Sequence, residues 1–346
     1  MTTTGTTHYH VQKTRRADFL EEWRKRRRTG VLRQADLRFR EREPGVRLAY
    51  YAGEEGAPTR TLDAGAHELD PGAATTPHRH SWDALLFVQE GSGWSEIGGE
   101  RIEWKPWDTI HVPAWTWHRH GNDGAKIARY LSFSSAPLLE TLNLASIEEA
   151  PPGADLAERP GFSPPRVGGD AYSRRVTRLA RANETAREAR IHMPYDELVL
   201  RNTPRGSRTA FCADESIGFR TSGLTIAMFQ IPPRKAQTMH RHPGEAFLYV
   251  IEGEGRSYID AEPEGGAEYR WGPGDMINVD HFLWHQHVND SPDTCARVIR
   301  VHMFASLLET MRALCDPVDL FNERPEDLAK ATDLAEFDWP PDDRPD

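Results

Sequence analysis

The chain carries one histidine-containing pattern twice, and this internal repeat limits what it can fold into more than any other feature. Residues 78–91 read HRHSWDALLFVQEG, and residues 240–253 read HRHPGEAFLYVIEG. A second pair of similar segments follows, WKPWDTIHVPAWTWHRHGN at 104–122 and WGPGDMINVDHFLWHQHVN at 271–289. A repeat of this kind predicts two similar domains in tandem, and 346 residues are enough for both.

Short alternating runs broken by Gly, Pro and Asp fill both copies of the repeat. They extend from about Arg47 to Ala136 in the first copy and from about Gly218 to Met303 in the second. Evenly spaced short strands of this kind are typical of an antiparallel sandwich or a small barrel. The Pro-rich segment 151–165 lies between the copies and reads as a linker.

Helices are expected only outside the strand-rich regions. Residues 14–29 place Phe19, Leu20 and Trp23 on one face, and Gly30 stands where such a helix would stop. Further helices are expected at 172–190 and 306–314. The predicted division is an N-terminal helical arm at 1–46, a first barrel at 47–145, a linker with a helix at 146–215, a second barrel at 216–315 and an acidic C-terminal segment at 316–346.

The charge of the chain excludes some partners. A formal net charge of -10 and a pI of about 5.9 argue against binding to nucleic acid or to an anionic membrane. Basic residues gather in 13–42 and acidic residues in 316–346, and we interpret both as solvated faces or as arms that pair within an oligomer.

The cysteines and the N-terminus indicate a reducing compartment. The three cysteines have no CxxC spacing, and they read as buried or incidental thiols: Cys212, Cys295 and Cys315. The N-terminal residues lack the apolar core of a signal peptide, and no stretch approaches the roughly 18 apolar residues of a membrane span. We expect a soluble, cytoplasmic protein with no membrane partner.

The histidines of the repeat have the spacing of metal ligands. Residues i and i+2 of a strand point to the same face, so His78 and His80 project together. A third ligand, His118, follows 40 positions after His78 on a strand that the fold would bring alongside. The second copy repeats the arrangement with His240, His242 and His285.

Three imidazoles on one face predict a divalent metal site. On an octahedral ion they leave up to three positions open, which suits a chelating substrate together with dioxygen. Imidazole binds iron, copper, zinc and nickel alike, so the ligand set alone does not select the metal.

The repeat resembles a bicupin, and its motifs HRHSWDALLFVQEG and VPAWTWHRHGN resemble the gentisate and salicylate 1,2-dioxygenase family over most of the chain. The resemblance implies an all-β fold with helical additions, in which a cupin barrel (a double-stranded β-helix) is duplicated. It implies Fe(II) on His78, His80 and His118, and a homotetramer. It also implies that dioxygen opens the ring of an aromatic hydroxy acid between its carboxyl-bearing and hydroxyl-bearing carbons.

Two positions depart from the common cupin pattern. Many cupins add a glutamate ligand four residues after the second histidine, but this chain has Ala84 and Ala246 there. Asp83 and Glu245 stand one residue earlier, where strand alternation turns them away from the metal. The all-histidine sites therefore argue against chemistry like that of oxalate decarboxylase or quercetinase.

Other departures concern the expected substrate pocket. Leu86 stands where the family commonly has an arginine for the substrate carboxylate, and Asp63 and His67 stand where a Trp and a Gln are expected. The changes favour a 5-substituted salicylate, such as the nitro or halogen compound, over gentisate. His67 could bind a ring substituent through a charge that changes near neutral pH, or it could be structural.

The remaining site predictions are made one residue at a time. His120 lies two positions after His118 and is predicted to act as a base or as a hydrogen-bond donor to the substrate. Trp117 is a predicted pocket wall, and Arg79, with Arg47 and Arg60, is a predicted partner of the carboxylate. Structural or surface positions are expected for His111 and His281, and no role is predicted for His192 or His302.

The first barrel is expected to perform catalysis because its pocket is the more polar one. His67 aligns with Phe229 of the second barrel, whose histidines could hold a structural or a second active metal. Two alternatives stay open. One is another bicupin oxygenase acting on hydroquinone or 1-hydroxy-2-naphthoate, and the other is a metal-stabilised cupin that binds an aromatic acid without turnover.

Overall fold

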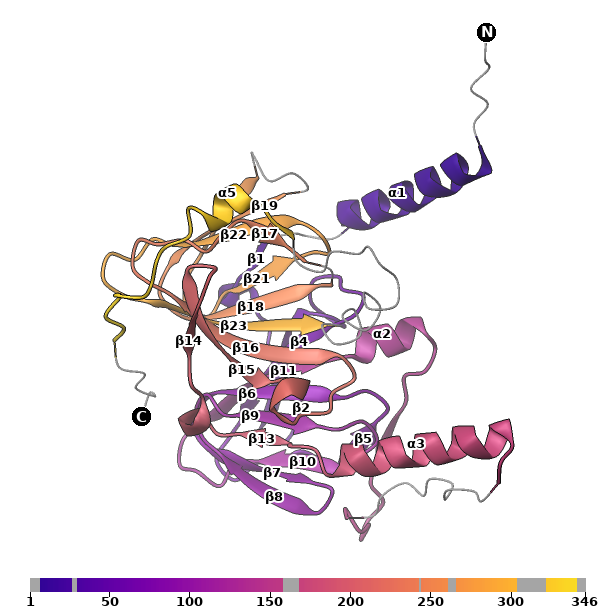
Figure 1. Cartoon of the computed structure of the whole chain (residues 1–346). Helices are drawn as coiled ribbons and strands as arrows, with labels where there is room; N and C mark the ends of the chain where they lie inside the picture. The colour runs from indigo at the N-terminus through magenta and orange to yellow at the C-terminus, as the bar shows by residue number, and fades with distance from the viewer. Residues whose placement is uncertain are drawn as a thin grey trace.

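The protein consists of two β-barrels side by side, with helices at the periphery (Figure 1). The computed structural model describes residues 7–26, 30–157, 168–242, 244–260, 266–303 and 322–340. In each barrel a seven-stranded sheet faces a five-stranded sheet. The predicted all-β fold with a duplicated barrel and helical additions is confirmed.

The first barrel has its large sheet in the order β13 (His192–Met193), β9 (Thr109–Val112), β6 (Ala84–Glu90), β11 (Ala128–Ser134), β4 (Asp63–Leu69), β3 (Val46–Ala52) and β2 (Arg40–Glu43). Its small sheet has the order β12 (Ile147–Glu149), β5 (His78–His80), β10 (His118–Gly121), β7 (Gly93–Ile97) and β8 (Glu100–Trp104).

The second barrel repeats this plan with a large sheet in the order β1 (Gly30–Leu32), β21 (Met276–Val279), β18 (Ala246–Glu252), β23 (Ala296–Met303), β16 (Leu224–Ile231), β15 (Ser207–Ala213) and β14 (Arg201–Thr203). Its small sheet has the order β20 (Ala267–Trp271), β19 (Gly255–Asp260), β22 (Trp284–Asn289), β17 (His240–Arg241) and β24 (Asn322–Glu323).

The segment that precedes each barrel supplies a strand to the other barrel. β1 precedes the first barrel in sequence but pairs with β21 of the second, and β13 precedes the second barrel but pairs with β9 of the first. Arg33, which follows β1, forms a 2.6 Å ion pair with Asp275 of the second barrel. Strand pairing also places 201–213 in the second barrel, ahead of its predicted start at 216.

The large sheets are apolar on both faces because one face packs inside its own barrel and the other packs against the other barrel. Leu85 and Phe87 of β6 belong to a core cluster that combines side chains of both barrels, including Phe247 and Ile299. The alternate residues of the same strand, such as Leu86, pack inside the first barrel. Burial of both faces explains why the strand reads ALLFV rather than alternating apolar and polar residues.

The helices lie outside the barrels as α1 (His8–Arg26), α2 (Ala136–Thr141), α3 (Ala171–Arg187) and α5 (Pro325–Leu328), with 3-10 turns at η1 (Gln34–Asp36), η2 (Tyr195–Glu197) and η3 (Glu215–Ile217). The helix predicted at 14–29 is thus present, but it begins at His8, since no Gly or Pro interrupts residues 8–13. Its predicted apolar face is not buried in a core: Phe19 is 64% exposed, and α1 projects away from the barrels (Figure 1).

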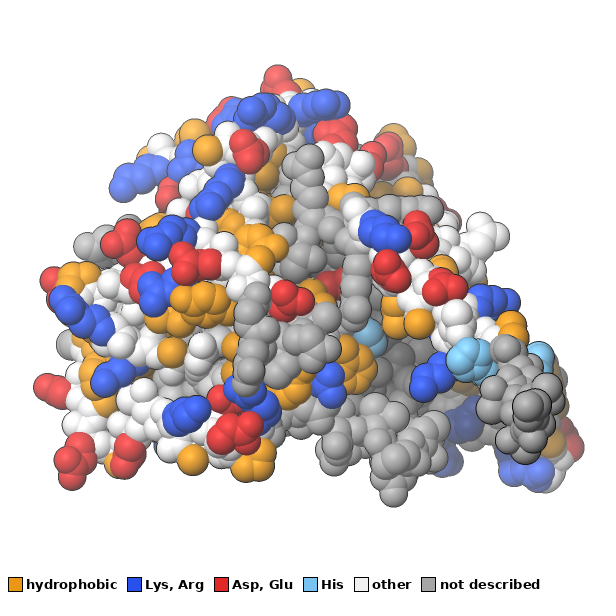
Figure 2. Space-filling model, turned by 90° about the horizontal axis from the view of Figure 1, so that it is seen from above, with side chains coloured by type: hydrophobic (Ala, Val, Ile, Leu, Met, Phe, Trp, Pro, Cys, Tyr) orange, Lys and Arg blue, Asp and Glu red, His pale blue; other side chains and the backbone are white. Residues whose placement is uncertain are grey.

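Some of the sequence predictions concern residues outside the part of the chain that the structure describes. The helix expected at 306–314 and Cys315 lie outside the described residues, whereas Cys212 and Cys295 are buried. Seen from above, basic and acidic side chains are interspersed over the surface in view (Figure 2). Among the described residues, none of the helices combines the length and the apolar character that crossing a membrane requires.

Candidate metal centres

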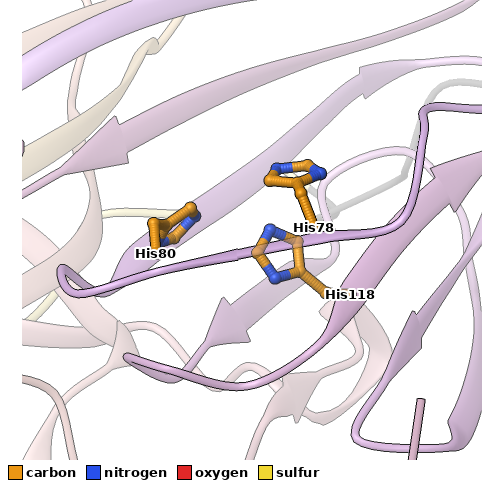
Figure 3. Close-up of side chains that lie close together, drawn as sticks. All are labelled: His78, His80 and His118. Carbon is orange, nitrogen blue, oxygen red and sulfur yellow. The ribbon is translucent and has the colours of Figure 1, made fainter. Parts of the chain in front are cut away.

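The three histidines of the first repeat meet inside the first barrel. β5 supplies His78 and His80, and the neighbouring strand β10 supplies His118, which pairs directly with His78. Their rings face a common point (Figure 3), and one ligand nitrogen from each lies within 4.8 Å of the others. The convergence predicted from the spacing is present.

Hydrogen bonds fix which nitrogen of each ring faces that point. The Nδ1 atoms of His78 and His118 lie 2.8 Å from the carbonyl oxygens of Thr76 and Thr116, and His80 Nδ1 lies 2.7 Å from that of Trp82. A carbonyl only accepts, so each Nδ1 carries the proton and each Nε2 keeps its lone pair. Burial lowers the pKa of His80 to about 4 and that of His118 well below its usual value.

The second barrel contains an equivalent triad. His240, His242 and His285 also bring their ligand atoms within 4.8 Å of one another, and all three are buried. His240 Nδ1 donates to Thr238 O at 2.9 Å, and His285 Nδ1 donates to Leu283 O at 2.8 Å. Burial lowers the pKa of His240 well below its usual value and that of His285 to about 4.

Both triads fit a divalent transition metal. The first offers three imidazoles whose Nδ1 atoms are held by backbone carbonyls, and the second offers two such rings, His240 and His285, together with His242. Carbonyl partners of this kind orient histidine ligands in metalloproteins. Ala84, where many cupins have a glutamate, lines the first cavity without offering a ligand. Asp83 points away from the triad: it accepts a 2.8 Å hydrogen bond from Ser135 Oγ, and His111 Nε2 lies 3.6 Å from its carboxylate.

The first triad opens into a cavity of about 290 Å³. The predicted site residues that line it, besides the triad, are Asp63, His67, Leu86 and His120. Leu48, Tyr130 and Trp82 add apolar walls. A cavity of this size is at the lower end of the range of roughly 300 to 1,000 Å³ for small-molecule sites.

A hydrogen-bonded chain orients His120. Trp104 Nε1 donates to Ser95 Oγ at 3.0 Å, and Ser95 Oγ lies 2.8 Å from His120 Nδ1. If the hydroxyl proton of Ser95 points to Nδ1, the Nε2 atom of His120 carries the ring proton and is a donor. Burial, reinforced by the charge of His78, lowers the pKa of His120 well below its usual value.

His67, like His120, packs against the ring of Tyr130. Its Nε2 atom lies 2.8 Å from Ser132 Oγ, and its ring stacks on Tyr130 with centroids 4.6 Å apart. Burial lowers the pKa of His67 to about 3, so the predicted change of charge near neutral pH is wrong for this residue. The reason is desolvation of the charged ring, which the sequence does not reveal.

Asp63 lines the first cavity and is a buried carboxyl group. Its carboxylate accepts from the backbone N and the Oγ of Ser134, both at 2.9 Å. Burial raises the pKa of Asp63 to about 7 despite these hydrogen bonds. The raised pKa of Asp63 could not be predicted from the sequence, which shows only a polar residue at this position.

The other predicted substrate contacts lie away from the cavity. Arg79 stands between two ligands on β5 and therefore points to the opposite face, where it pairs with Glu148 and stacks over Trp117 at 4.3 Å. Neither Arg79 nor Trp117 is among the lining residues, so these placements do not support the predicted contacts. Arg47 and Arg60 do not line the cavity either.

The second triad opens into a cavity of about 330 Å³ with different walls. Arg205 and Arg300 line it together with Phe229, which replaces His67. His302, for which no role was predicted, packs against His242 with ring centroids 4.2 Å apart. The sequence analysis missed Arg300, although aligning ARYLSFSS (128–135) with ARVIRVHM (296–303) sets it against Ser132.

The fold and the paired histidine triads define a protein built from two cupin barrels. A family model described as Cupin domain matches residues 65–134 and 227–302. Among solved structures, a variant of the salicylate 1,2-dioxygenase from Pseudoaminobacter salicylatoxidans in complex with gentisate has a similar fold, with a TM-score of 0.58 and 16% identity over 90% of this chain and 95% of that one. The protein is therefore a bicupin.

Sequence similarity defines the family more narrowly. The chain is 32% identical over 245 residues to gentisate 1,2 dioxygenase 1 of Aquipseudomonas alcaligenes, which covers 66% of this chain and 67% of that one. It is 26% identical over 249 residues to 5-aminosalicylate 1,2-dioxygenase of a Comamonas species, and the match spans 66% of this chain and 63% of that one. The chain belongs to the gentisate and salicylate 1,2-dioxygenase family.

Proposed function

We propose that the protein is a metal-dependent dioxygenase that opens the ring of a salicylate-type hydroxybenzoate, either gentisate or a 5-substituted salicylate. The bond between the carboxyl-bearing and hydroxyl-bearing carbons breaks, and both atoms of dioxygen enter an open-chain oxo diacid. The observation that carries the proposal is the convergence of His78, His80 and His118 in the lining of one cavity in a member of this family. The names of the relatives, which refer to gentisate and 5-aminosalicylate, support the substrate class.

Fe(II) is the proposed cofactor, held by His78, His80 and His118. When bound, ferrous iron would supply a Lewis acid for the hydroxyl and carboxylate oxygens of the substrate and electrons for dioxygen. Burial lowers the pKa of His80 and His118 and keeps these two rings neutral, and backbone carbonyls keep the three Nε2 atoms aimed at one point. Loss of either feature would weaken metal binding before it affected any chemical step.

The walls of the first cavity orient the substrate. Leu48, Leu86 and Tyr130 present apolar surface to an aromatic ring, which restricts the ring and excludes water. In the tautomer proposed above, His120 offers its Nε2 proton to a substrate oxygen. Asp63 and Ser134 lie where a polar group on the ring would be recognised, which favours substituted salicylates over the parent acid.

Oxygen uptake after anaerobic reconstitution with Fe(II) tests the proposal. The substrate panel is salicylate, gentisate, 5-nitrosalicylate, 5-chlorosalicylate, 1-hydroxy-2-naphthoate and hydroquinone. We expect uptake with at least one hydroxybenzoate and loss of uptake after chelation, with recovery on adding Fe(II) but not zinc. Protein that is shown to contain iron and consumes no oxygen with any of these compounds would rule out the proposed activity.

A further inference from the structure

The balance of charged residues differs between the two cavities. Arg205 and Arg300 line the second cavity, and no Asp or Glu is among its described lining residues. The lining of the first cavity includes the carboxyl groups of Asp63 and Glu43, and its arginine, Arg42, pairs with Glu55 at 3.0 Å. Charged side chains therefore favour an anionic ligand more strongly in the second cavity than in the first.

Arg300 occupies a defined position in the repeated fold. It lies on β23 opposite Leu248 of β18, and the equivalent pair in the first barrel is Ser132 opposite Leu86. Both leucines line their cavities, so the Arg300 side chain enters the second barrel where only a short hydroxyl enters the first.

The partner available to Ser132 has no counterpart in the second barrel. Ser132 Oγ lies 2.8 Å from His67 Nε2, whereas the residue equivalent to His67 is Phe229, which offers no acceptor. The Nε atom of Arg300 is shielded from solvent and has no hydrogen-bond partner among the described residues. A guanidinium donor left without an acceptor in a barrel interior is costly, and a bound carboxylate would satisfy it.

The charge of Arg300 acts on the second triad. Burial is the main reason that the pKa values of His285 and His287 are low, and the positive charge of Arg300 lowers both further. Burial and the charge of Arg205 lower the pKa of Arg300 itself to about 10, so it remains a cation at neutral pH. Arg300 and the three ligand histidines line the same cavity.

The remaining walls suit a flat apolar ring. Phe229, Leu248, Ala210 and Phe211 give the cavity of about 330 Å³ apolar surface, and its other lining residues besides the arginines and histidines are Thr203, Pro204, Ser207, Thr209 and Gln237. Arginine side chains, apolar surface and a triad of ligand nitrogens in one cavity favour an aromatic carboxylate over an inorganic anion.

We propose that the second barrel is a separate binding site for an aromatic monocarboxylate. Arg300 pairs with the carboxylate, and the ligand shares the cavity with a metal ion held by His240, His242 and His285. Ligand binding at this site does not require catalysis in the first barrel.

Salicylate binding to the full-length chain tests this site. The His118→Ala variant removes a ligand of the first triad, and zinc replaces iron so that no turnover occurs. Zinc content is measured to show that the second triad is loaded. Isothermal titration calorimetry should show one salicylate per chain in His118→Ala. Adding Arg300→Met should raise the Kd about tenfold or more, which corresponds to about 1.4 kcal/mol.

A matched variant separates a local role from a general charge effect. Arg241 stands between two ligands of the second triad but stacks over Trp284 at 4.8 Å, outside the cavity lining. Arg241→Met in the same background should leave the Kd for salicylate unchanged, and Arg300→Lys should give a Kd between those of His118→Ala and the Met variant. Zinc-loaded His118→Ala that binds no salicylate, or an Arg300→Met variant with unaltered Kd, overturns the proposal. Because the first triad is disabled and zinc is present, neither result depends on whether the first barrel is a dioxygenase.

Discussion

Asp83 of the first barrel and Glu245 of the second occupy equivalent positions. Asp83 accepts a hydrogen bond from the loop before β16 of the second barrel, and Glu245 accepts hydrogen bonds from the loop before β4 of the first. The backbone N of Ser222 donates to Asp83 at 2.8 Å, and the backbone N of Thr61 donates to Glu245 at 2.9 Å. The two carboxylates thus form a reciprocal pair of contacts across the interface. Their position beside the metal-binding strands reflects a role in joining the barrels.

Asp83→Ala should destabilise the protein by about 2 to 4 kcal/mol because it leaves buried donors, including Ser135 Oγ, without an acceptor. Burial raises the pKa of Asp83, but the neighbouring His111 ring and the hydrogen bonds from Ser222 N and Ser135 Oγ outweigh it, so the pKa lies below its usual value. This stability is therefore present above the unfolded pKa of 3.8 and is lost as the pH falls through the folded pKa. Urea denaturation at pH 7 and pH 3 measures the change, with exposed Glu100→Gln as a control. An equal loss of stability in both variants would contradict the interface role.

His118→Ala should abolish oxygen uptake and most iron binding in the first barrel, whereas His285→Ala should keep substantial activity. The physical reason is that each triad provides three imidazoles, and removing one leaves too few ligands to hold the ion. Iron per chain and oxygen uptake are measured on the same samples. If His285→Ala is inactive while its first-barrel iron is intact, catalysis belongs to the second barrel.

Asp63 should control how activity depends on pH. Burial raises its pKa from 3.8 to about 7, so it is largely neutral below pH 7 and ionised above. An ionised carboxylate would repel an anionic substrate, and kcat/KM should fall on the order of tenfold between pH 6 and pH 8.5. Asp63→Asn should flatten this part of the profile, and an unchanged profile in that variant would assign the titration to another group.

The raised pKa of Asp63 also predicts an effect on stability. The neutral form is favoured in the folded state, so the contribution of Asp63 is fully present below pH 3.8 and is lost as the pH rises to about 7. The free energy of unfolding of wild type minus that of Asp63→Asn should therefore fall over this interval. Denaturant titrations at pH 4, 5.5 and 7.5 measure it, and a difference that rises with pH would reverse the sign of the argument.

The substrate preference should depend on Leu86 and His67. Leu86 cannot make the charge-assisted contact of about 1.5 to 3 kcal/mol that an arginine offers a carboxylate. We expect kcat/KM for 5-nitrosalicylate and 5-chlorosalicylate to exceed that for gentisate, and Leu86→Arg with His67→Gln to shift the ranking towards gentisate. Gentisate preferred by tenfold or more in wild type, with neither replacement altering the order, would show that these positions do not set specificity.

The barrels and the two histidine triads could be predicted from the sequence. Both follow from strand alternation and from a repeat in which the same histidine spacing occurs in each copy. The same alternation places Arg79 on the face opposite His78 and His80, where it pairs with Glu148. The predicted contact between Arg79 and the substrate was inconsistent with this alternation. Other features depend on burial and on pairing between distant segments. The pKa of Asp63 and the pairing of β1 with β21 are examples, and no local pattern reveals them.

The reciprocal strands β1 and β13 give one chain the plan of a two-fold symmetric dimer. Two identical subunits would have identical sites, so any substitution would change both at once. Joining the two halves by a covalent linker lifts that restriction. One half could then keep Ser132 while the other acquired Arg300, so that a single polypeptide has two chemically distinct binding sites.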